Sequence, residues 1–173
     1  AMGPQGLNDI NLKLPDGLDS IQLVTHVIVS VCRNNSDCGI KTPFTVPNGK
    51  NFYVTKMRHS SYRAGASGGI YANGVHIHSV SSCVIETNNP IIVGENMIVT
   101  ANVSGSSNGC SQGFSTIEGF LVDKKVEVIL QNSNYIVPVN KLFVQVNNSN
   151  SFPQIYMPGS VIPPRVNGFL ISK

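Results

Sequence analysis

A run of hydrogen-bond donors with one aromatic ring lies at residues 58–63. Its members are Arg58, His59, Ser60, Ser61, Tyr62 and Arg63. An aromatic face can stack on the C–H groups of a sugar while fixed donors bind its hydroxyls. This run is therefore a candidate ligand site, and an ordinary solvated loop is the alternative interpretation.

Two histidines, His76 and His78, stand two residues apart in a segment that we expect to be a strand. Both rings would then lie on the same face of the sheet, where neutral imidazoles can bind a transition metal. In a homotrimer, three such pairs would surround the axis, which resembles the HxH iron sites of phage tail-fibre needles. Those fibres use several HxH repeats and this chain has one, so an exposed polar strand face is the simpler interpretation. We expect no cofactor.

The predicted ligand-binding residues combine members of the donor run with two polar residues that follow it in the sequence. They are Arg58, His59, Tyr62, Arg63, Tyr71 and His76.

Catalytic signatures are missing from the sequence. The chain has no GxSxG or HExxH motif, and its nine acidic residues are scattered. Glycoside hydrolysis needs two facing carboxylates, and no spacing selects a pair among distant candidates such as Glu86, Glu95 and Glu118. We therefore predict that the protein is not an enzyme and keep a small hydrolase as the least favoured alternative.

Four cysteines allow three disulfide connectivities. The spacing favours Cys32 with Cys38 around a tight turn, and Cys83 with Cys110 around a longer loop. Free buried thiols are the alternative. A zinc site is poorly supported because neither pair has CxxC spacing and no histidine stands at finger distance.

Composition indicates an extracellular β-protein. Charged residues make up 12% of the chain, against roughly 25% in an average soluble domain, and 19 Asn and 19 Ser supply the polar surface instead. The net charge of +3 is spread along the chain, whereas a nucleic-acid partner requires a dense basic patch. No apolar run approaches the ~20 residues of a membrane span, so we predict neither nucleic-acid binding nor membrane insertion.

The chain repeats itself. FTVPNGKNF at residues 44–52 returns as YIVPVNKLF at residues 135–143, and EGFLVDK at 118–124 returns as NGFLISK at 167–173. Each copy opens with VPxxK and ends with GFLxxK, and the extra residues of the first copy include the candidate ligand site. Such self-similarity predicts duplicated units that share a core.

Segments rich in β-branched residues, separated by turn signals, predict an all-β chain. Asn73-Gly74 is a hairpin signal because Asn-Gly readily takes the positive φ of a tight turn. We expect an antiparallel β-sandwich or jelly roll with an internally duplicated β-unit. Its predicted parts are an N-terminal arm or stalk remnant at residues 1–20, a first β-sandwich unit at 21–130, and a shortened second repeat at 131–173 packed on the first.

The order TVPNGKNFYV, YANGV, NPIIVGENMIVT and IEGFLVDKK resembles β-sandwich head domains of bacterial and viral surface fibres, including collagen-like and tail-fibre proteins. The resemblance covers residues 44–125, and residues 135–173 in abbreviated form, and it supplies no functional residues. It implies an extracellular, non-enzymatic adhesion or receptor-binding head, expected as a homotrimer that attaches to a cell-surface glycan or protein receptor. A purely structural module that trimerises and caps the fibre is the alternative.

Overall fold

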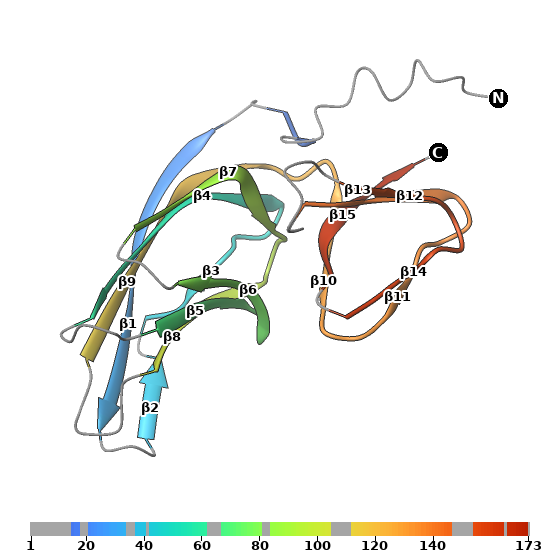
Figure 1. Ribbon diagram of the computed structural model, residues 1–173. Helices are drawn as coiled ribbons and strands as arrows, with labels where there is room; N and C mark the ends of the chain where they lie inside the picture. The colour runs from blue at the N-terminus through green and yellow to red at the C-terminus, as the bar shows by residue number, and fades with distance from the viewer. Residues whose placement is uncertain are drawn as a thin grey trace.

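The computed structural model describes residues 15–17, 21–33, 37–40, 42–61, 67–80, 84–104, 112–146, 154–164 and 166–172 (Figure 1). These residues form an all-β structure of antiparallel sheets, which confirms the predicted fold class. The jelly-roll topology and the duplication remain predictions.

The strands follow one another closely along the chain. They are β1 (Gln22–Arg33), β2 (Asp37–Ile40), β3 (Phe44–Thr45), β4 (Lys50–Ser61), β5 (Ser67–Ala72), β6 (Val75–Val80), β7 (Val84–Val93), β8 (Ile98–Ser104), β9 (Gln112–Asp123), β10 (Glu127–Gln131), β11 (Tyr135–Ile136), β12 (Lys141–Gln145), β13 (Gln154–Tyr156), β14 (Val161–Ile162) and β15 (Val166–Ser172).

Four sheets organise these strands. Sheet A has the order β2-β1-β9-β4-β7 and sheet B the order β3-β8-β5-β6, and together they form the first unit. Sheet C has the order β10-β15-β12-β13 and sheet D pairs β11 with β14, and these form the second unit. Because β10 pairs with β15, we count β10 in the second unit; the predicted division of the chain into domains stays a prediction.

Three hydrophobic cores join the sheets in the order B, A, C, D. Phe52 of sheet A packs in one core with Ile70 of sheet B. Its neighbour Tyr53 points to the other face and packs with Phe169 of sheet C, as the two-residue period of a strand requires. Phe143 fills the third core, between sheets C and D. Sheet A is therefore covered on both faces where the two units meet.

The two units have equivalent strand pairings. In the first unit Phe52 lies opposite Leu121, and in the second Phe143 lies opposite Leu170. Their turns also share a hydrogen-bond pattern. The bond from Val46 N to Met97 O corresponds to that from Val137 N to Ser160 O. The bond from Asn96 N to Val46 O corresponds to that from Gly159 N to Val137 O. The bond from Lys50 N to Pro47 O corresponds to that from Lys141 N to Pro138 O.

A glycine in each GFL motif allows a close strand approach. A Cβ atom on Gly119 would lie 2.0 Å from the carbonyl oxygen of Tyr53, and one on Gly168 would lie 2.1 Å from that of Val144. Real Cβ atoms do not approach backbone oxygens so closely, so the fold requires glycine at both positions. The recurrence of this motif therefore has a steric reason in each unit.

The Asn73-Gly74 hairpin forms as predicted. Asn73 has φ 47° and Gly74 φ 75°, and the turn joins β5 to β6. The Asn73 side chain also accepts a hydrogen bond from Ile98 N at 2.8 Å, which ties the hairpin turn to β8.

The cysteines are described only in part. The antiparallel pairing of β1 with β2 places Cys32 in register with Cys38, while Cys83 and Cys110 lie outside the described residues. Both disulfides therefore stay predictions.

Candidate functional site

Two of the predicted ligand residues, Tyr71 and His76, contact each other. They lie opposite each other on β5 and β6, with ring centroids 5.1 Å apart in an edge-to-face arrangement at 60°. Both side chains are half-buried, whereas Ile70 and Ile77 beside them are buried in the core. The alternation directs the Tyr71–His76 pair to the outer face of sheet B, where a ring face and an imidazole are accessible together.

The other predicted ligand residues lie elsewhere in the chain. Arg58 and His59 belong to β4 of sheet A, whereas Tyr71 and His76 belong to β5 and β6 of sheet B. Tyr62 and Arg63 lie outside the described residues. The six-residue ligand site therefore stays a prediction.

His78 belongs to β6 with His76, but the β5–β6 register shifts between them: His76 lies opposite Tyr71 and His78 opposite Ile70. The HxH metal site therefore stays a prediction. Within the described ranges, no group of three or more His, Cys, Asp or Glu side chains could hold a metal ion.

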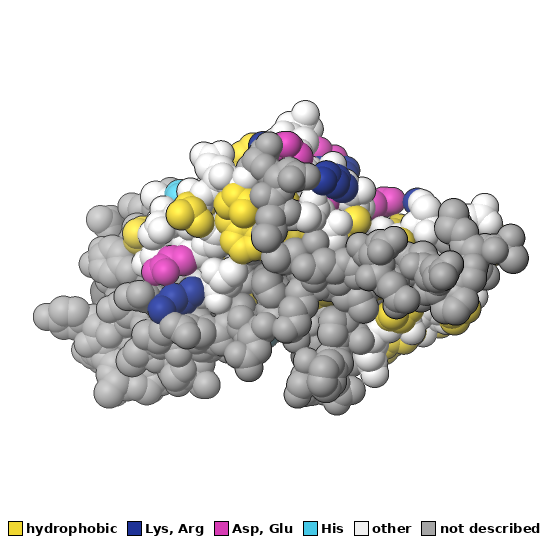
Figure 2. Space-filling view, turned by 90° about the horizontal axis from the view of Figure 1, so that it is seen from above, with side chains coloured by type: hydrophobic (Ala, Val, Ile, Leu, Met, Phe, Trp, Pro, Cys, Tyr) yellow, Lys and Arg dark blue, Asp and Glu magenta, His cyan; other side chains and the backbone are white. Residues whose placement is uncertain are grey.

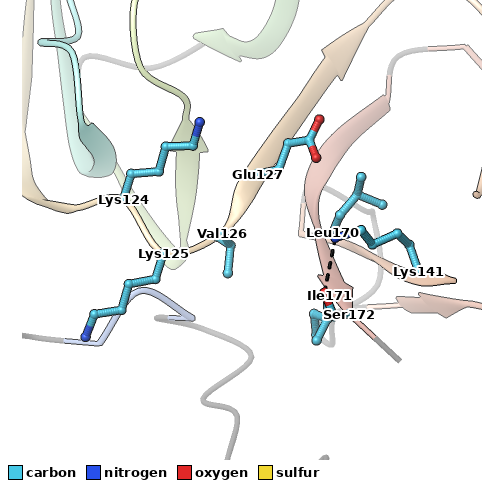
Figure 3. Close-up of a pocket in the computed structure, with 8 residues that line it drawn as sticks. All are labelled: Lys124, Lys125, Val126, Glu127, Lys141, Leu170, Ile171 and Ser172. Carbon is cyan, nitrogen blue, oxygen red and sulfur yellow. Dashed lines mark hydrogen bonds between the residues drawn. The ribbon is translucent and has the colours of Figure 1, made fainter.

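A cavity of about 350 Å³ opens where the two units meet (Figure 3). Its lining comes from the linker between β9 and β10 and from the ends of β12 and β15. In the view of Figure 3, two linker lysines lie to the left and the Lys141–Ser172 pair to the right. The lining residues are Lys124, Lys125, Val126, Glu127, Lys141, Leu170, Ile171 and Ser172.

The first unit ends in ion pairs beside this cavity. The ammonium of Lys50 lies 2.6 Å from the carboxylate of Asp123. Lys124 contacts the carboxylate of Glu95, which also accepts a hydrogen bond from Gly49 N at 2.8 Å. The hydrogen bond from Lys124, and then that from Gly49, hold the pKa of Glu95 below its usual value.

A buried carboxylate, that of Asp16, contacts the first unit and the linker between the two units. Asp16 is 1% exposed, and one of its oxygens accepts hydrogen bonds from Tyr53 Oη at 2.6 Å and Asn51 Nδ2 at 2.8 Å. Its other oxygen accepts bonds from the backbone N–H groups of Lys125 and Val126. We call these contacts the Asp16 clasp. Asp16 thus links β4 of the first unit to the linker that leads into the second.

The clasp affects the chemistry of Tyr53. Burial, together with the hydrogen bond and the charge of Asp16, raises the pKa of this phenol far above its ordinary value of 10.0. Sequence reasoning missed the clasp, because it assigned residues 1–20 to an arm or stalk remnant with no predicted contacts.

Large hydrophobic side chains are exposed on β1, on β8 (Ile98) and in the second unit. On β1 and just before it, Ile21 is 45%, Leu23 83% and Val27 46% exposed. In the second unit, Val139 is 80% and Val161 60% exposed. Figure 2 shows hydrophobic side chains gathered on the upper surface beside acidic and basic groups. Contiguous patches of this kind often mark interaction sites.

No protein-family model, curated protein or solved structure matches this chain. Among the residues that the structure describes, none belongs to a helix long and apolar enough to cross a membrane.

Proposed function

We propose that the protein is a non-enzymatic, extracellular binding head of a fibre or adhesin, which attaches to a cell-surface ligand such as a glycan. The observation that carries this proposal is the accessible Tyr71–His76 pair on the β5–β6 hairpin. Sheet D of the second unit has only two strands, so its outer face lacks an equivalent hairpin in the described structure. A feature added to a repeated scaffold is a natural place for recognition.

The chemistry of the pair suits a sugar. The ring of Tyr71 offers an apolar face to the C–H groups of a sugar, and its edge-to-face contact with His76 helps to fix the orientation of that ring. Their strands belong to sheet B, which packs on sheet A through a fully buried core. The scaffold therefore holds both side chains with little freedom to lose on binding.

A hydrolase has less support. Glycoside hydrolysis uses two carboxylates that face each other across the substrate. Of the described residues that line the junction cavity, Glu127 alone is acidic. The cavity therefore suits binding better than acid–base catalysis.

We also infer that the two units are copies of one ancestral β-unit. Equivalent strand pairings, equivalent turn hydrogen bonds and the two glycine contacts support this inference. A copied unit that kept its scaffold and gained a hairpin is consistent with a scaffold adapted for recognition.

Exposed hydrophobic residues favour a second candidate, a module that trimerises and caps a fibre. Leu23 and its neighbours on β1 would be covered if copies of the chain met along this strand. Light scattering tests this directly: a trimeric mass that Leu23→Ser reduces to monomer supports it, and a monomeric wild type contradicts it. The two candidates are compatible, because a trimer would multiply a weak site affinity by avidity.

Attachment to intact cells tests the leading proposal. The labelled chain, clustered on a tetrameric carrier, is applied to a panel of bacterial and animal cells, followed by Tyr71→Ala, Tyr71→Phe and the distant control Asn134→Ala. We expect saturable attachment to at least one cell type, lost in Tyr71→Ala and retained in Tyr71→Phe and the control. Attachment that Tyr71→Ala leaves unchanged would overturn the proposed site.

A further inference from the structure

Lys141 and Ser172 occupy in the second unit the places that Lys50 and Asp123 occupy in the first. Each lysine follows a VPxx turn and donates its backbone N–H to the proline carbonyl of that turn. Lys50 lies in register with Asp123, and Lys141 lies in register with Ser172. The two positions can therefore be compared directly.

The comparison reveals a missing carboxylate. In the first unit the Lys50 ammonium is neutralised by Asp123 at 2.6 Å. In the second, the Lys141 ammonium contacts only the neutral Ser172 hydroxyl, at 3.1 Å, among the described side chains. An ammonium has three donors, so Lys141 can bind an additional acceptor.

The position where the second unit lacks a carboxylate borders the junction cavity, because Lys141 and Ser172 both line it. The volume of about 350 Å³ is at the lower end of the range for small-molecule sites and suits a single sugar ring. Figure 3 shows Lys141 and Ser172 together on one side of this space, joined by their hydrogen bond.

The remaining walls combine apolar and charged groups. Val126, Leu170 and Ile171 provide an apolar surface, and Glu127 adds a negative charge. Lys124 and Lys125 add positive charges, and Lys124 contacts the carboxylate of Glu95. Lysines outnumber the single acid among the described lining residues, so the cavity favours an anionic ligand.

We propose that the junction cavity binds a carboxylate-bearing ligand of monosaccharide size, such as a uronic acid. Lys141 holds the ligand carboxylate where the first unit has its own Asp123, and the Ser172 hydroxyl donates a hydrogen bond to it. This inference goes beyond the proposed function, because neither Tyr71 nor His76 lines the junction cavity.

An NMR titration of the full, isotope-labelled chain with D-glucuronate tests the proposal. We expect saturable shifts of the backbone signals of Lys141 and Ser172, and none with D-glucose, which lacks the carboxylate. Lys141→Met removes the cation, and Ser172→Asp supplies an internal carboxylate as in the first unit. Each should weaken binding at least about tenfold, whereas the matched change Lys50→Met in the first unit should leave it unchanged.

Several results would overturn the proposal. They are an absence of saturable shifts in the wild type, equal binding of D-glucose or inorganic phosphate, and unchanged binding by Ser172→Asp. Ser172→Asp adds an ion pair to an exposed position, so it remains informative if Lys141→Met fails to fold. Cell attachment that depends on Tyr71 but not on Lys141 would leave the binding function intact and refute this site alone.

Discussion

Replacement of Asp16 by alanine should destabilise the whole protein although the residue lies outside every strand. The Asp16 clasp accepts two hydrogen bonds from buried side chains and two from backbone N–H groups. Water can reach the partly exposed linker and satisfy the backbone donors. The hydroxyl of Tyr53, a residue with 0% exposure, would keep no acceptor in the clasp. Orphaned buried donors cost about 1–3 kcal/mol each, so we expect a loss of about 2–4 kcal/mol.

Urea denaturation measures this loss, and two further variants isolate its cause. Asp123→Ala removes a carboxylate that is 52% exposed, and an exposed pair contributes about 0–1 kcal/mol. Tyr53→Phe removes the orphaned hydroxyl, so the double variant Asp16→Ala/Tyr53→Phe should lose less than the sum of the single losses. A loss for Asp16→Ala no larger than that for Asp123→Ala would refute the reasoning.

Three further predictions follow from single contacts. The pKa of Tyr53 is raised above its ordinary 10.0, so its ionisation favours the unfolded state. The free energy of unfolding should not depend on Tyr53 below pH 10.0 and should fall as the pH rises above it. Tyr53→Phe should remove this slope in alkaline urea titrations. The pKa of Glu95 is lowered from 4.5, so its contribution should be present above pH 4.5 and lost on further acidification; a Glu95→Gln variant that keeps the same acid dependence would contradict this. Gly119→Ala and Gly168→Ala should each lower the free energy of unfolding by about 3 kcal/mol or more, because a Cβ would strike a backbone oxygen. Gly49→Ala has open space but φ +73°, so it should lower the free energy of unfolding by about 1–2 kcal/mol. Thermal unfolding distinguishes these two outcomes.

The sequence predicted most of the fold because its signals are local. Long β-branched runs gave the main strands, and Asn73-Gly74 gave the hairpin, since both depend on neighbouring residues. The repeated VPxxK and GFL motifs mark turns and close strand contacts that both units contain. Strands as short as β3, β11 and β14 have two residues each, which are too few to show a recognisable period in the sequence.

The candidate sites depend on contacts between distant residues, which no local pattern encodes. Asp16 meets Tyr53 across 37 positions and Val126 across 110. Arg58 and Tyr71 are close in sequence, yet they lie on strands of different sheets, β4 of sheet A and β5 of sheet B. The Lys141 site becomes visible only when the side chains of the two units are compared.

Competition on the cell surface tests the central claim most directly. Labelled wild-type chain is bound to the cell type that retains it best, and unlabelled wild type or Tyr71→Ala is then added. The account predicts that unlabelled wild type displaces the label and that Tyr71→Ala requires at least about tenfold more protein. Equal displacement by the two proteins, or no saturable binding to any cell type, would contradict a binding head that acts through the Tyr71–His76 face.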